Sequence, residues 1–217
     1  MKKLITPSTT LKVLAAFSVL PIMIRVATTG EFTGLFLVWN LFLAWLPLPL
    51  ARGFAKTFRA EASWLRLFMA GILFIWWLLF FPNAPYIVTD LIHLDGNHNP
   101  HYWLESIVLF SIAMTGLFTG IYSMYLVHKR IESVTGKLFA LTVMVGCSFL
   151  SGFGIYLGRV QRWNTWDIIT QPTALLRGAY HAVQEPLALE MTIGFGLLVI
   201  ICYFMLLSLL QYEKHSG

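Results

Sequence analysis

Long runs of apolar residues divide the chain into six segments. Each approaches the roughly 20 apolar residues that a helix needs to cross a bilayer core of about 30 Å. The predicted spans cover residues 11–29, 34–50, 64–81, 104–127, 138–158 and 187–210. The second span is short and ends in Pro47 and Pro49, which leave its inner boundary open. We therefore predict an all-α, polytopic membrane protein, with a single six-helix transmembrane domain over residues 1–217 and short interfacial helices in the outer loops.

Composition supports this class. The chain is 58% hydrophobic and only 12% charged, with a mean hydropathy of +0.72, whereas a soluble domain carries about 25% charged residues. Cys147 and Cys202 both lie within apolar runs and are interpreted as small buried hydrophobic residues. The pI near 9.3 does not indicate a nucleic-acid partner, because the basic residues form no soluble patch.

The basic residues instead set the orientation. If both termini are cytoplasmic, every lysine lies inside, and arginine is the basic residue of the outer loops. The inner set is Lys2, Lys3, Lys12, Arg52, Lys56, Arg59, Arg66, Lys129, Arg130, Lys137 and Lys214; the outer set is Arg25, Arg159, Arg162 and Arg177. By the positive-inside rule, we predict a multi-pass protein with cytoplasmic N- and C-termini.

A polar outer loop follows the third span, from Phe81 to Trp103. The stretch Pro82-Asn83-Ala84-Pro85 ends or kinks that span and starts a new short helix. In a helix, Asp90 and His93 share one face at i, i+3. His101 and Glu105 follow at i, i+4 at the start of the fourth span, beyond a bend that carries His98.

A second outer cluster follows the fifth span, over residues 152–167. Gly154 and Gly158 form a small-xxx-small pair that allows another helix to approach closely. If the helix continues past them, Arg159 and Arg162 lie near one face. Asn164, Asp167, His181, Glu185 and Glu190 come later on the same side, and Asn40 of the second span is a candidate to join an outer cavity.

The stretch PNAPYIVTDLIHL, with the later GIYLGR and RWNTWD, resembles a bacterial membrane-protein family catalogued as domain-of-unknown-function family 1361. The resemblance covers nearly the whole chain. It implies a multi-pass protein of the bacterial cytoplasmic membrane, with the two outer clusters as a shared feature and no assigned activity.

Two interpretations of the histidines remain open. The outer side holds Asp90, His93, His98, His101, Glu105, His181 and Glu185, which exceeds the three or four ligands that a zinc ion needs. The candidate ligands for a divalent metal such as zinc are His93, His101, Glu105 and His181. Alternatively, the histidines are solvated and the carboxylates cap helices or pair with arginines.

The arginines also have two interpretations. Arg159 and Arg162 would bind an anionic lipid, a lipid-linked group or a peptide carboxylate, with Asn83 and Asp167 shaping the site. In the other interpretation, one of them pairs with Asp90, Asp95 or Asp167 and joins two loops.

We predict a ligand-binding membrane protein whose polar site, with histidine, aspartate and arginine, lies at the extracytoplasmic membrane interface, with membrane lipids as its partners. The alternative is a metal-dependent or His/Asp-based hydrolase or transferase acting on a lipid-linked or peptide substrate, with Asp90 and His93 as catalytic residues. A transporter is disfavoured, because the predicted midplane is nearly free of charge.

Overall fold

The computed structural model describes residues 6–30, 32, 34–93 and 102–215. Within these ranges the chain is helical, with no strand. Six segments among the described residues are long and apolar enough to cross a membrane: Pro7–Thr28, Leu35–Thr57, Trp64–Ile92, Trp103–Thr135, Lys137–Arg159 and Pro186–Tyr212. The predicted all-α class and the number of spans are confirmed.

Five of these segments correspond to the helices α1 (Pro7–Thr29), α4 (Trp64–Phe80), α6 (Tyr102–Thr135), α7 (Lys137–Arg159) and α10 (Pro186–His215). The remaining span comprises α2 (Leu35–Trp45) and α3 (Pro47–Thr57). The prediction that this span stops near residue 50 is wrong. Pro47 starts α3 at a first-turn position, where proline needs no backbone donor, so the chain stays helical to Thr57.

Short helical elements form in the two segments where polar loops were predicted. The segment after α4 forms α5 (Asn83–Tyr86) and the 3-10 helix η1 (Ile87–His93). After α7, the chain forms α8 (Asp167–Thr170) and α9 (Pro172–Ala182) before it enters α10.

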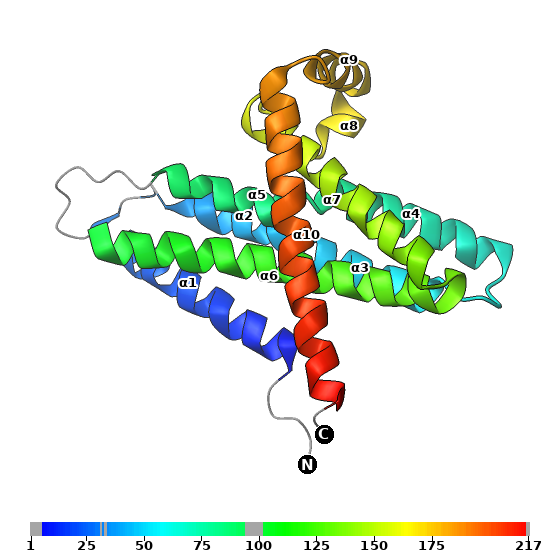
Figure 1. The fold of residues 1–217 in the computed structure, drawn as a ribbon. Helices are drawn as coiled ribbons and strands as arrows, with labels where there is room; N and C mark the ends of the chain where they lie inside the picture. Colours follow the sequence, from blue (N-terminus) through cyan, green and yellow to red (C-terminus); the bar gives the residue numbers. More distant parts are fainter. Residues whose placement is uncertain (1–5, 31, 33, 94–101, 216–217) are drawn as a thin grey trace.

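Helix α6 lies at the centre of the fold. It contacts α1, α2, α3, α5, η1, α7 and α10; α2 and α3 extend along it, while α1 crosses it obliquely (Figure 1). The main core cluster packs Trp77 of α4 against α6 and α7, while a second cluster packs Leu41 and Ile87 against the first half of α6. The segment α5–η1 therefore lies directly on the central helix.

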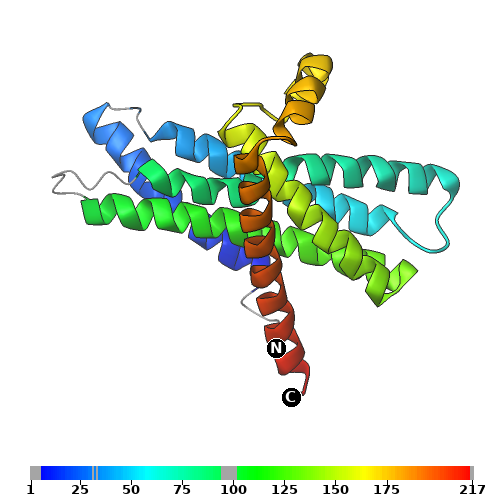
Figure 2. The same ribbon diagram turned by 45° about the horizontal axis from the view of Figure 1, so that its top comes forward.

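Helix α10 lies crosswise on this group of helices rather than alongside them (Figures 1 and 2). It packs mainly on α7, where two glycines allow close approach. A Cβ on Gly152 would lie 2.5 Å from the Thr192 carbonyl oxygen, and a Cβ on Gly196 would lie 2.5 Å from the Phe149 ring. The crossing of α7 and α10 thus depends on the absence of two side chains.

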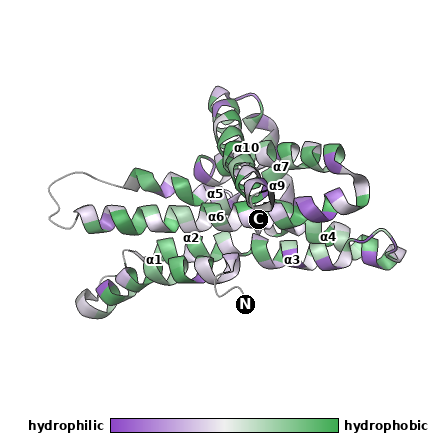
Figure 3. Ribbon diagram, turned by 60° about the horizontal axis from the view of Figure 1, so that its bottom comes forward, coloured by the Kyte–Doolittle hydropathy of each residue, from purple (hydrophilic) through white to green (hydrophobic). Residues whose placement is uncertain are grey.

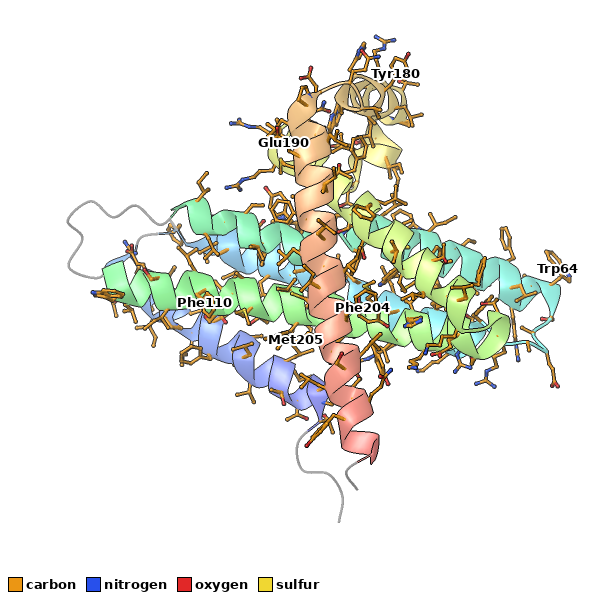
Figure 4. The ribbon with its side chains drawn as sticks, in the orientation of Figure 1. Trp64, Phe110, Tyr180, Glu190, Phe204 and Met205 are labelled. Carbon is orange, nitrogen blue, oxygen red and sulfur yellow. The ribbon has the colours of Figure 1, made fainter. Side chains whose placement is uncertain are left out.

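Apolar side chains cover the outside of the fold as well as its core. Hydrophobic residues predominate along the long helices, and hydrophilic residues gather towards several helix ends (Figure 3). Large apolar side chains such as Trp64 and Tyr180 point away from the bundle (Figure 4). A surface of this kind is suited to lipid, because a soluble protein exposes few large apolar patches.

Candidate functional site

A buried ion pair joins the two polar clusters of the sequence. Asp90 of η1 is 2% exposed, and its Oδ1 lies 3.0 Å from Nη1 of Arg159 at the end of α7. Its other carboxylate oxygen, Oδ2, accepts a hydrogen bond of 2.8 Å from the side-chain amide of Asn40 in α2. Both oxygens of Asp90 are therefore engaged, and three separate segments meet at one carboxylate.

Arg159 is held by more than Asp90. Its guanidinium donates to the Thr89 carbonyl oxygen at 3.2 Å and to the Tyr86 hydroxyl at 3.4 Å, and it lies 5.7 Å from the centre of the Tyr86 ring. Its side chain is 24% exposed. In these contacts the guanidinium donates hydrogen bonds to groups of the protein itself. They agree with the interpretation in which an arginine forms an ion pair between two loops, and the partner is Asp90.

Two pairs of glycines place the segment that carries Asp90. On α6, a Cβ at Gly116 would lie 2.8 Å from Ile87, and a Cβ at Gly120 would lie 2.7 Å from Ala84. On α7, a Cβ at Gly154 would lie 2.7 Å from Pro82.

Gly158 continues the α7 pair, since a Cβ there would lie 3.4 Å from the Tyr86 ring. The prediction that this pair lets another helix approach closely is confirmed at Gly154, where the start of α5 lies too close for a side chain, whereas at Gly158 the contact with Tyr86 is an ordinary one. The matching pair on α6, Gly116 and Gly120, was missed, although its spacing in the sequence is the same.

Asn83 and Asp167 shape the neighbouring chain. The Asn83 amide donates to the Phe80 carbonyl oxygen at 3.0 Å and to the Thr165 hydroxyl at 3.1 Å, which ties α5 to the loop after α7. Asp167 is buried, accepts from the Asn164 backbone at 2.7 Å and from the Thr170 hydroxyl at 3.1 Å, and so closes the turn that starts α8. The Asn83 side chain thus bonds back to the end of α4 and does not cap α5.

A cavity of about 370 Å³ lies next to the ion pair, within the ~300–1,000 Å³ range of small-molecule sites. Helices α2, α4, α5 and α7 and the segment from Trp163 to Leu175 form its walls. Most of the lining is apolar: Leu43, Leu78, Leu79, Leu150, Phe153 and Leu157. The polar lining side chains include Asn40, Asn83, Asn164 and Thr165.

Tryptophans gather at the same cavity. Trp39, Trp163 and Trp166 all line it, and the rings of Trp39 and Trp166 meet edge to face at 6.4 Å between centroids. The Trp163 indole N–H donates to the Gln161 side chain at 3.0 Å. No spacing in the sequence indicated that Trp39 and Trp166, from distant segments, would meet.

Arg162 does not join Arg159. Helix α7 ends at Arg159, and Arg162 lies beyond it, exposed and with a φ of 62°. The expectation that the two arginines share a helix face is wrong, because the chain turns away before residue 162.

The predicted metal ligands are spread over several elements. The backbone of His93 ends η1, while its side chain, together with all of His98 and His101, lies outside the described residues. Glu105 pairs with Arg25 of α1 at 3.0 Å, and His181 is exposed on α9. Among the described residues, no three histidine, cysteine, aspartate or glutamate side chains gather as a metal site would require. The full set of four stays a prediction.

The six apolar spans and the polar site built from their connecting segments define a multi-pass helical membrane protein. Within that class, the chain belongs to the family described as "Protein of unknown function (DUF1361)", whose model matches residues 39–202. The match includes every described residue of the Asp90–Arg159 site and starts after α1, so the predicted resemblance is confirmed over that range. No curated protein and no solved structure matches the chain.

Proposed function

We propose that this protein binds an amphipathic ligand from the membrane, in the cavity beside the Asp90–Arg159 pair. The observation that carries the proposal is the composition of that cavity. Apolar side chains from α4 and α7 form most of its wall, and a few polar groups converge on it from α2, α5 and the loop after α7. Ligand sites in proteins typically have this combination.

The ion pair has a supporting role in this proposal. Asp90 holds the Asn40 amide at 2.8 Å, and Arg159 holds Tyr86 through its ring and hydroxyl. Asn40 and Tyr86 both line the cavity. The pair thus orients two lining residues, while its charges neutralise each other.

We propose further that the site faces the extracytoplasmic leaflet of the bacterial cytoplasmic membrane. The distribution of lysines and arginines over the connecting segments supports this orientation. In this proposal, membrane lipids surround the protein and also supply its ligand.

A hydrolase based on Asp90 and His93 has less support. A general base needs an oxygen within reach of the substrate's proton, but the two oxygens of Asp90 bind Arg159 and Asn40. Asp90 is also not among the residues that line the cavity.

The proposal is tested by filling the cavity. Leu150 lines the cavity and is 55% exposed, so Leu150→Trp adds volume at the site without changing the core. The matched control is Leu138→Trp on the same helix, because Leu138 is 79% exposed and does not line the cavity.

Each protein is extracted with its surrounding lipid in polymer-bounded nanodiscs, purified and analysed by lipid mass spectrometry. We expect one lipid species to be enriched with the wild type and with Leu138→Trp, and to lose its enrichment with Leu150→Trp. Equal lipid profiles for all three proteins would contradict the proposal.

A further inference from the structure

We infer that the ligand carries an uncharged, hydroxyl-bearing head group on an apolar chain, bound between the amides of Asn40 and Asn83 and the apolar wall of α7. This inference rests on the proposed function and specifies its ligand. It replaces the expectation from the sequence that the site binds an anion.

The first argument is the absence of charge from the cavity wall. Among the described residues that line the cavity, none is charged. A charged head group in this space would lose water without gaining a counterion, which is unfavourable. The lining therefore disfavours anions and cations alike.

The nearby charges do not reverse this argument. The Arg159 guanidinium faces Asp90, Thr89 and Tyr86. Arg162 is exposed and does not line the cavity. Asp167 accepts hydrogen bonds from Asn164 and Thr170 within its own turn.

The second argument is the hydrogen-bonding capacity that the cavity offers. The Asn83 amide donates to the Phe80 carbonyl oxygen and the Thr165 hydroxyl, and the Asn40 amide donates to Asp90. Their Oδ1 atoms accept no hydrogen bond from any described residue. Carbonyl oxygens that face a cavity need donors, and a hydroxyl supplies one while keeping its own oxygen free to accept from other groups.

The third argument is the shape of the rest of the lining. Flat indole rings of Trp39, Trp163 and Trp166 suit the C–H face of a polyol or sugar ring, which is apolar while its edge is polar. Leu78, Leu150 and Phe153 extend the wall along the membrane spans, where an alkyl chain is soluble. Together, the two regions match one neutral glycolipid-like molecule.

Three probes with the same eight-carbon chain test the inference: octyl glucoside, octyl sulfate and octyltrimethylammonium. Each is labelled with tritium and equilibrated, below its micellar concentration, with nanodiscs that contain wild-type protein, Leu150→Trp, or lipid alone. Binding to the cavity is the saturable difference between wild type and Leu150→Trp, since both share the same lipid background.

We expect octyl glucoside to bind wild type at least about tenfold more tightly than either charged probe, a difference of ~1.4 kcal/mol. If a charged probe binds as tightly or more tightly, the inferred head group is wrong while the proposed function stands. If no probe distinguishes wild type from Leu150→Trp, the proposed function itself is overturned, and the inference with it.

Asn83→Asp adds a second, independent test. The substitution keeps the shape of the side chain, gives up the hydrogen bonds that the amide donates to the Phe80 carbonyl oxygen and the Thr165 hydroxyl, and places a carboxylate in the cavity wall. We expect it to raise the affinity for octyltrimethylammonium and to lower that for octyl glucoside, each by about tenfold or more. An unchanged order of the three probes in a folded variant would show that Asn83 does not face the head group, against the inference.

Discussion

Replacing Arg159 by methionine removes the cation that neutralises Asp90 but keeps a long, flexible side chain. The carboxylate is 2% exposed, so it cannot regain water without movement of α5–η1. Breaking a buried pair by removing one partner typically costs about 3–5 kcal/mol. The Asn40 amide still donates to Asp90 at 2.8 Å, so we expect the lower end of that range, about 3 kcal/mol.

A double-mutant cycle separates the pair from its surroundings. Asp90→Asn keeps the shape of the side chain, and the charge that it leaves without a partner is a guanidinium that is already 24% exposed. We therefore expect it to lower the free energy of unfolding by less than Arg159→Met does. In the double variant, the uncompensated charge is gone. We expect a coupling energy of about 2 kcal/mol between positions 90 and 159, within the ~0.5–3 kcal/mol found for interacting residues.

The assay is unfolding of the purified protein in mixed micelles titrated with sodium dodecyl sulfate, followed by circular dichroism. Arg25→Met is the control, because Arg25 pairs with Glu105 at the same distance of 3.0 Å, but with side-chain exposures of 49% and 37%. Exposed pairs contribute about 0–1 kcal/mol. The reasoning would be refuted if Arg159→Met lowered the free energy of unfolding by no more than Arg25→Met does. It would also be refuted if the changes in free energy at positions 90 and 159 were simply additive.

Three further predictions concern packing, strain and orientation. Gly152→Ala should destabilise the protein by about 1–3 kcal/mol, because the new Cβ would lie 2.5 Å from the Thr192 carbonyl oxygen. The control is Gly146→Ala on the same helix, where a Cβ meets open space, and it should leave stability unchanged or raise it by up to about 1 kcal/mol. Equal effects of the two variants in the same unfolding assay would contradict this prediction. Arg162→Gly should leave stability unchanged or raise it by up to about 1 kcal/mol, because a φ of 62° disfavours a side chain; a loss of stability or of ligand enrichment would show that the arginine side chain itself is needed. In a protein without its own cysteines, a cysteine at Gln184 should react with an impermeant maleimide on intact cells, and one at Ala60 only after permeabilisation; the reverse pattern would overturn the orientation.

The spans and the position of the polar clusters were predictable from the sequence, because hydropathy alone decides which segments can enter lipid. The partner of Arg159 was not. The sequence left Asp90, Asp95 and Asp167 open, and the choice depends on how α5 fits against the glycines of α6 and α7. That fit is a property of three helices together, which no single segment encodes.

The lack of charged side chains among the described residues that line the cavity could not be predicted from the sequence either. Asp90, Arg159, Arg162 and Asp167 lie in two short polar stretches, and clustering in sequence favoured a charged site. In the structure, Asp90 and Arg159 face each other, Arg162 is exposed and Asp167 closes its own turn.

The direction of α10 was likewise unpredictable, since a span that is apolar on all sides has no apolar stripe to show which face packs.

The separation of Asp90 and Arg159 by 69 residues also bears on how the protein is made. At a synthesis rate of about 5–20 residues per second, roughly 3–14 s pass between the two. Until α7 emerges, neither the cation nor the Gly154–Gly158 surface exists to receive the preceding segment. Gly116 and Gly120 of the fourth span and Asn40 of the second can already receive α5–η1 and Asp90, but the carboxylate gains its cation only when the fifth span arrives.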